Sequence, residues 1–389
     1  MTKRTSTLKN TAIAVSFALG GMATTVQANT AGDTSFNFTG YVKVDALVSD
    51  YSDGTLGPQS LGRDLYVPSL TPIGGQSEGA QFDFHAKTSR FRLSSVTDDG
   101  NGDQIKGVIE LDFIVTEGGN ERISNSYTTR IRHAYIQYKN WMVGQNWSNF
   151  MDVSALPETL DFIGSTDGIT FARQPQVRYT NGAFSFSLEN PETTINPEGG
   201  GARIVTDDNS VPDFVATYTA KQDWGYVKFA GILRQLRYDN GTMDDATNGY
   251  GATVTGKYNL SNGDDIRFSF YTGSGLGRYG SLNLVNGAVL KNDGSLEAID
   301  SMGYFVGYRH MWNEKLRSSL TFSAAHVDND TAISGLATTK QVYSTRVNLL
   351  YSPVKSITIG AEYAYANREN EAGAEGDMNR VQFSAKYAF

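Results

Sequence analysis

The sequence contains no cysteine, 9 prolines and 4 histidines among its 389 residues. Without cysteine, no disulfide framework can stabilise the fold. The histidines (His85, His133, His310 and His326) lie far apart in the sequence and show no metal-ligand spacing. Neither a Walker motif nor a dinucleotide-binding fingerprint is present. These absences predict a protein that uses no metal and no cofactor.

Long hydrophobic runs are also missing beyond the first residues. Hydrophobic residues make up 39% of the chain, a low share for a helical membrane protein. No later stretch approaches the roughly 20 apolar residues that a transmembrane helix requires. A membrane protein built from this sequence would have to cross with strands, which need only about 9–11 residues each.

The N-terminus resembles a secretory signal peptide. Lys3, Arg4 and Lys9 precede the apolar run TAIAVSFALGGMATT, and Val26-Gln27-Ala28 has the small-x-small pattern of a cleavage site. We therefore predict a signal peptide over residues 1–28 and a mature domain over residues 29–389. Its removal lowers the lysine and arginine count from 33 to 30 against 41 acidic residues, so the net charge becomes −11. An acidic exported protein is not expected to bind nucleic acid.

Aromatic residues and glycine are abundant, with 21 Tyr, 20 Phe and 41 Gly. Apolar and polar residues alternate from FNFTGYVKVDALVSD near residue 36 to RVQFSAKYAF at the C-terminus, the period of a half-buried strand. We count about sixteen such segments, an even number within the range of bacterial barrels. A secreted soluble β-protein is the alternative that composition alone leaves open.

The connections between these segments favour the membrane barrel. Short turns such as Lys139-Asn140 and Asn181-Gly182 are expected to alternate strictly with long loops, including 149–172, 238–249, 274–301 and 368–378. This alternation is typical of barrels with periplasmic turns and external loops. The predicted fold is an all-β transmembrane antiparallel β-barrel of about 16 strands, in which the last strand pairs with the first because a sheet edge in lipid would leave backbone groups unsatisfied.

Strand parity predicts a basic lumen. The inward set has few acids but many basic residues, and those predicted to line the pore are Lys43, Arg178, Arg267, Arg309, Arg346 and Arg380. Fixed positive charge in a narrow pore favours anions. In the alternative interpretation, these side chains pair with carboxylates and stiffen the wall.

Two segments concentrate guanidinium groups: SRFRL, with Arg90 and Arg92, and TRIRHAY, with Arg130 and Arg132. Simple parity places the second pair on the same face as the apolar residues that follow, so a β-bulge or a subunit-facing wall must intervene. Bidentate recognition of carboxylates is the functional interpretation, and burial in a subunit interface is the rival.

The loop after the fifth strand, residues 149–172, is too apolar for a free external loop. We predict that it folds inward as a constriction loop, with its apolar residues against the wall and its acids toward the lumen. These acids are Asp152, Glu158, Asp161 and Asp167. Packing against a neighbouring subunit is the alternative.

The strings DFHAKTSRFRL, NERISNSYTTRIRHAY, WMVGQNWSNFMDVSALPETLDFIG and RQPQVRYTNGAFSFSLENPET, with the terminal Phe389, together resemble the DcaP-like family of Gram-negative outer-membrane porins. The resemblance covers roughly residues 36–195. It implies a homotrimer in the outer membrane, in contact with lipid and lipopolysaccharide, that takes up small anions, dicarboxylates in particular. Many relatives carry a coiled-coil segment before the first strand, and here only residues 29–35 separate the predicted signal peptide from that strand.

The expected function is therefore passive diffusion of small anionic solutes and not catalysis. A general, weakly selective porin is the alternative within this class. An outer-membrane hydrolase or an adhesion barrel is the alternative from other classes, although no Ser-His-acid arrangement points to an enzyme.

Overall fold

The computed structural model describes residues 25–27, 34–115 and 124–389. The predicted signal peptide lies outside this part of the chain except for β1 (Thr25–Gln27), which pairs with residues 35–37. Its cleavage remains a prediction. Among the described residues, no helix is long and apolar enough to cross a membrane.

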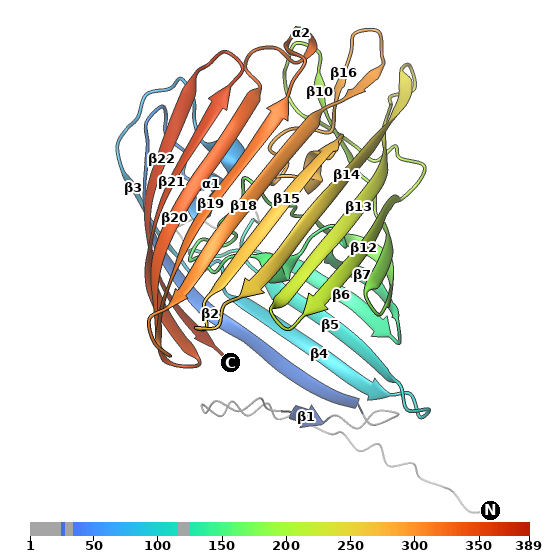
Figure 1. The fold of residues 1–389 in the computed structure, drawn as a ribbon. Coiled ribbons are helices and arrows are strands. Elements are labelled where there is room, and N and C mark those ends of the chain that lie inside the picture. Colours follow the sequence, from blue (N-terminus) through green and yellow to red (C-terminus); the bar gives the residue numbers. More distant parts are fainter. Residues whose placement is uncertain (1–24, 28–33, 116–123) are drawn as a thin grey trace, which may run out of the picture.

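The described residues form a closed antiparallel barrel of 16 strands (Figure 1). The second of these is interrupted at residues 86–89 and therefore has two parts, β3 and β4. The barrel strands are β2 (Thr34–Tyr51), β3 (Gln81–His85) with β4 (Arg90–Asp98), β5 (Gln104–Asp112), β6 (Arg130–Tyr138), β7 (Trp141–Trp147), β8 (Arg173–Asn181), β9 (Phe184–Glu189), β12 (Asp213–Gln222), β13 (Gly225–Asp239), β14 (Asp244–Asn259), β15 (Asp265–Ser274), β18 (Asp300–Met311), β19 (Leu316–Asp328), β20 (Thr339–Val354), β21 (Ile357–Asn370) and β22 (Glu375–Ala388).

The last strand closes the barrel on the first, as predicted. β2 pairs with β22 from Tyr41↔Ala388 to Tyr51↔Met378. Phe389 exchanges two backbone hydrogen bonds of 3.0 Å with Gly40, and its ring lies 5.6 Å from that of Phe38. No sheet edge is left at this seam to face lipid.

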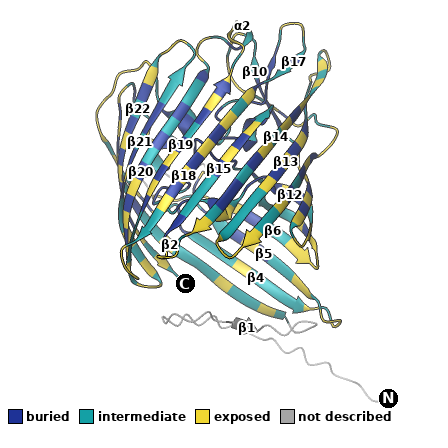
Figure 2. Ribbon diagram, viewed as in Figure 1, coloured by how far each residue is buried: buried dark blue, intermediate teal, exposed yellow. Residues whose placement is uncertain are grey.

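Alternation along the strands separates the two faces of the wall. On β13, Phe229 and Leu233 are exposed on the outside, whereas Ala230, Ile232 and Arg234 are buried on the inside. Figure 2 shows the resulting bands of buried and exposed residues along the strands. The outer band is apolar, as a lipid-facing surface requires.

Short turns and long loops lie at opposite ends, but two predicted long loops are wrong. β13 and β14 continue to a four-residue connection at 240–243, and β21 and β22 continue to one at 371–374. Their polar ends still pair, as Asp239↔Asp244 and Glu369↔Glu375 show. The apolar pattern of these strands ends before their backbone pairing does, so alternation alone predicts strands that are too short.

Three long loops matter for the lumen: L1 (residues 52–80), L3 (residues 148–172) and L6 (residues 275–299). They contain α1 (Leu61–Asp64), η1 (Pro68–Leu70), η2 (Val153–Ala155) and η3 (Gly277–Tyr279). A small sheet of β10 (Thr193–Pro197), β11 (Ile204–Thr206), β16 (Ala288–Leu290) and β17 (Leu296–Ala298) lies at the long-loop end, as does α2 (Thr331–Ser334) (Figure 1).

Candidate functional site: an internal loop facing a cluster of arginines

L3, which follows the fifth barrel strand β7, folds into the barrel and touches the wall on several sides. Near its start, Asp152 accepts hydrogen bonds from Tyr226 on β13 (3.0 Å) and Thr255 on β14 (2.8 Å). Further along, Glu158 forms a bidentate pair with Arg317 on β19 at 2.6 and 2.7 Å. L3 therefore crosses the interior of the barrel from β7 and β8 to the opposite wall.

The tip of L3 is fixed by backbone hydrogen bonds. The amide of Leu160 donates to Glu362 on β21 at 2.8 Å, and its carbonyl accepts from Lys43 Nζ at 2.6 Å and Gln382 Nε2 at 3.0 Å. Backbone groups enclosed in a barrel need such partners. The wall here provides donors and acceptors that match the loop.

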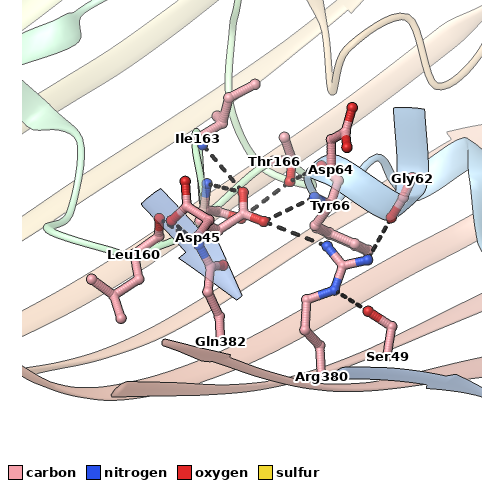
Figure 3. Close-up of polar contacts among 12 residues, drawn as sticks. Asp45, Ser49, Gly62, Asp64, Tyr66, Leu160, Ile163, Thr166, Arg380 and Gln382 are labelled. Atoms are coloured by element: carbon pink, nitrogen blue, oxygen red, sulfur yellow. Dashed lines mark hydrogen bonds and ion pairs between the residues drawn. The ribbon is translucent and has the colours of Figure 1, made fainter. Parts of the chain in front are cut away.

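L1 covers the tip and completes this attachment. Asp161 accepts a hydrogen bond from the backbone amide of Tyr66 at 2.9 Å, and the Tyr66 hydroxyl donates to Asp167 at 2.6 Å. Arg380 donates to Ser49 and to the carbonyl of Gly62 in L1 (Figure 3). Two loops and the wall thus form one polar network.

The orientation predicted for L3 is wrong. Asp161 and Asp167 are buried against L1 and the wall, at 3% and 0% exposure, and Asp152 and Glu158 bond to wall residues. The exposed residues of L3 are instead Val153, which is 42% exposed, and Ser154. The physical reason is that the inner wall carries arginine and hydroxyl groups, so the acids of the loop find their partners there.

The environment of L3 shifts two of its carboxyl groups in opposite directions. Burial opposes ionisation of Glu158, but the hydrogen bonds and charge of Arg317 outweigh it and lower its pKa. Burial raises the pKa of Asp167 to about 6, although hydrogen bonds from Ser344 and Tyr66 favour the ionised form.

The arginines of SRFRL and TRIRHAY come together on the inner wall. Arg130 binds Asp112 through two hydrogen bonds of 2.9 Å, and Arg132 bridges Glu110 and Asp112 at 2.8 Å each. Arg90 and Arg92 lie 3.6 and 3.7 Å from Glu110. Four guanidinium groups therefore share two carboxylates, and the cluster carries excess positive charge.

A β-bulge, one of the two explanations that the sequence left open, brings Arg130 and Arg132 to this face. The β5–β6 register shifts between Glu110↔His133 and Leu111↔Ile131, which leaves Arg132 as the extra residue. Arg132 and His133 are both buried, at 2% and 6% exposure, while Ile131 is 54% exposed. The bulge reverses the parity of the strand at this point.

A cavity of about 310 Å³ lies between this cluster and L3. Arg90, Arg92 and Arg132 line one side, and Leu156 and Phe162 of L3 line the other. The Phe162 ring lies 5.7 Å from the Arg90 guanidinium and 5.4 Å from that of Arg132. These arginines face the interior of the barrel, as does L3.

The other predicted pore residues lie on the inner face but differ in exposure. Arg346 and Arg380 are covered by the loops, at 2% and 1% exposure, so in this structure they contact protein groups and not an open lumen. Lys43, Arg267 and Arg309 are partly exposed and lie 2.6 to 2.9 Å from carboxylates. Arg178 donates to Gln176 and to the carbonyl of Trp147.

Ion pairing is therefore common along this wall, as the alternative interpretation held. Parity assigns each side chain to the inner face but does not show which loop covers it. That is why Arg346 and Arg380 could not be separated from the exposed arginines by sequence.

Arg173, the first residue of β8, is a further arginine of this region that was not predicted from the sequence. Its guanidinium lies 4.8 Å from the Trp147 ring, and it forms no ion pair with a carboxylate within the described part of the chain. Its position directly after L3 was the available signal. Across the same residues, no cluster of three or more histidines or acids could hold a metal ion.

Comparison with known proteins agrees with this architecture. The sequence profile of the family described as "DcaP outer membrane protein" matches residues 5–389. The crystal structure of the outer membrane channel DcaP of Acinetobacter baumannii is 25% identical, with a TM-score of 0.74 and coverage of 92% of this chain and 97% of that chain. No curated protein sequence matches significantly.

More distant structures share the fold. OmpT of Vibrio cholerae is 13% identical with a TM-score of 0.54, covering 94% of this chain and 100% of that chain. The anion-selective porin of Comamonas acidovorans is 11% identical with a TM-score of 0.55, covering 92% and 100%. Because the family match spans nearly the whole chain, this protein belongs to the DcaP outer membrane protein family and forms a channel in the Gram-negative outer membrane.

Proposed function

We propose that this channel admits small anionic solutes, dicarboxylates in particular, and that L3 limits their size. The observation that carries the proposal is the excess of guanidinium groups beside the cavity under L3. Four arginines share Glu110 and Asp112 there, and Arg173 adds a further charge without a carboxylate partner among the described residues. Fixed cations in a narrow, low-dielectric passage lower the barrier for anions.

The two carboxylates of a dicarboxylate match this arrangement. Arg92 is the most open member, with its side chain 36% exposed, and Arg90 is 23% exposed. Guanidinium groups bind carboxylates through paired hydrogen bonds, and two neighbouring groups can hold both ends of a small diacid. We propose no catalytic activity for the protein.

The protein is further proposed to act as a homotrimer surrounded by lipid and lipopolysaccharide. A shallow apolar groove of about 500 Å³ crosses the outer wall at β2 and β20–β22, and it is lined by small residues such as Ala46, Gly360 and Ala385. Exposed Phe82 and Phe84 lie on β3 beside β2. Small side chains flanked by aromatic ones suit close contact with a second copy, which native mass spectrometry in mild detergent would detect.

The test of anion preference compares Arg92→Ala with the wild type in liposomes. A charge about 4 Å from a guanidinium interacts by about 1 kcal/mol in water and more at lower dielectric, so succinate flux should fall about fivefold or more. Flux of a neutral solute of similar size should not change. Arg237→Ala, which removes an arginine at the long-loop end, is the matched control.

Reversal potentials in a salt gradient separate the alternatives. The proposal is supported if the reversal potential of the wild type lies toward the equilibrium potential of the anion and if this displacement is smaller in Arg92→Ala. A general porin would show weak selectivity in both proteins and an equal loss of charged and neutral flux. A barrel that hydrolyses substrates and has no open pore would not conduct.

A further inference from the structure

L6 follows β15 and folds into the barrel. Leu276 and Tyr279 are completely buried, and Ser281 is 1% exposed. The η3 turn reverses the chain there, and Gly277 has a φ of +48°, a conformation that favours glycine. L6 is therefore buried at the point where an external loop would leave the barrel.

L6 pairs directly with the end of L3. Thr170 and Gly280 form an antiparallel bridge, in which the amide of Phe171 donates to the carbonyl of Tyr279 at 2.9 Å. The amide of Ser281 donates to the carbonyl of Ile169 at 2.8 Å. The two internal loops are thus joined by backbone hydrogen bonds.

Tyr279 also anchors L6 to the wall. Its hydroxyl donates to Asp213 on β12 at 2.9 Å and accepts a hydrogen bond from Gln174 on β8. Arg234 on β13 donates to the carbonyls of Gly275 and Leu276 at 3.1 and 2.8 Å. Both Asp213 and Arg234 are buried on the inner face, so these contacts lie inside the barrel.

The inner wall under L6 is largely apolar, unlike the wall that carries the arginine cluster. Leu276 and Tyr279 pack with inner-face residues Val215, Ile232 and Tyr271. Further along L6, a second apolar cluster joins loop and wall, consisting of Leu284, Val289, Ile299, Ala325, Val327 and Val342. Apolar side chains at these inward positions would be unfavourable against a water-filled lumen, whereas they are favourable when a loop packs on them and excludes water.

We propose that L6 is a second internal loop of this channel. It fills the long-loop half of the lumen beside β12–β15 and β18–β20, and it directs solutes that enter from that end to the passage between L3 and β4–β7. Tyr279 is then a positioning residue, because it holds L6 in place without touching the solute. This inference rests on the channel activity and not on the proposed preference for anions.

An engineered disulfide tests whether L6 stays inside during conduction. Thr170 and Gly280 form a non-hydrogen-bonded antiparallel pair, for which Cα atoms lie about 4.5 Å apart, within the range of disulfides. The chain has no other cysteine to interfere. At Gly280 a Cβ would lie 3.1 Å from the Tyr271 hydroxyl, so that ring must shift by a few tenths of an ångström.

The double variant Thr170→Cys/Gly280→Cys should form the bond on oxidation and keep wild-type single-channel conductance. A conductance that falls on oxidation and recovers with a reductant would show that L6 leaves the lumen in the conducting state and would overturn the proposal. Failure of the thiols to form a bond in folded protein would do the same.

Tyr279→Ala supplies the opposite perturbation. Release of L6 should roughly double the conductance, because a second aqueous path opens beside the first, and larger neutral sugars should pass. The Thr170–Gly280 disulfide added to this variant should restore the wild-type conductance, an effect that a merely structural defect would not show. Tyr250→Ala, which removes a tyrosine that is 58% exposed on the outer wall, is the matched control.

Unchanged conductance and sugar cutoff in folded Tyr279→Ala would refute the inference. If Tyr279→Ala fails to fold, Tyr279→Phe keeps the ring and removes only the hydroxyl's bonds to Asp213, Gln174 and Glu189. The disulfide experiment then decides independently. A loss of anion preference without a change in any of these readouts would concern the proposed function alone.

Discussion

The ion pair between Glu158 of L3 and Arg317 of β19 provides the sharpest test of how the channel is held narrow. The two hydrogen bonds measure 2.6 and 2.7 Å, and the side chains are 29% and 14% exposed. Arg309 lies 3.8 Å from the same carboxylate. Charge-assisted hydrogen bonds of this kind contribute about 1.5 to 3 kcal/mol to an attachment.

Glu158→Gln keeps the shape of the side chain and removes its charge. A loss of about 1.5 to 3 kcal/mol raises the population with L3 detached about 10- to 150-fold. Planar-bilayer recordings should show this as more frequent transitions to higher conductance. Arg317→Gln should produce the same transitions because it breaks the same contact.

The two variants should differ in ion selectivity. Glu158→Gln removes the negative partner of Arg317, while Arg309 keeps its ion pair with Asp265, so anion preference should increase. Arg317→Gln should decrease it. In the double variant the reversal potential should return toward the wild-type value, because both charges are removed. The transitions to higher conductance should be as frequent as in either single variant, because the same contact is lost in all three.

The bidentate pair of Arg237 with Asp244, at 3.0 and 3.1 Å, offers a matched control at the long-loop end. Asp244→Asn should leave the recordings unchanged. If Glu158→Gln gave wild-type noise at all voltages, or if Asp244→Asn gave the same noise, the role of this pair in holding L3 would be refuted.

Two further predictions concern pH and assembly. Burial raises the pKa of Asp167 to about 6, above its value in the unfolded chain, so ionisation of this group opposes folding of L3 against the wall. The contribution of Asp167 to the free energy of unfolding is therefore complete below about pH 4. It is lost, by about 3 kcal/mol, as the pH rises through about 6. Asp167→Asn should remove this slope in thermal melts, and an unaltered slope would contradict the assignment. Deleting Phe389 removes two backbone hydrogen bonds to Gly40 and the stacking on Phe38, about 2 to 4 kcal/mol at the closing seam. Less folded barrel on semi-native gels is expected, and a wild-type yield would argue against it.

Several features of this protein follow from sequence alone. Period-2 alternation predicted the sixteen strands, the closure of the last strand on the first and the inward face of most basic residues. These are local properties, because successive side chains of a strand point to opposite faces whatever else the chain does. The break in alternation at Arg130 and Arg132 was also visible in the sequence, but a bulge and a subunit-facing wall explained it equally well, and the structure shows the bulge.

Only the tertiary structure decided what lies against the inner face. Parity placed Arg346 and Arg92 on the same side of the wall, yet L1 and L3 cover the first and leave the second open. The acids of L3 face the wall and L6 lies inside the barrel because their hydrogen-bond partners are on strands far away in the sequence. For the backbone of L3 this separation reaches about two hundred residues, as in the bond from the Leu160 amide to Glu362. Contacts of that range depend on the closed barrel, and no local pattern in the sequence encodes them.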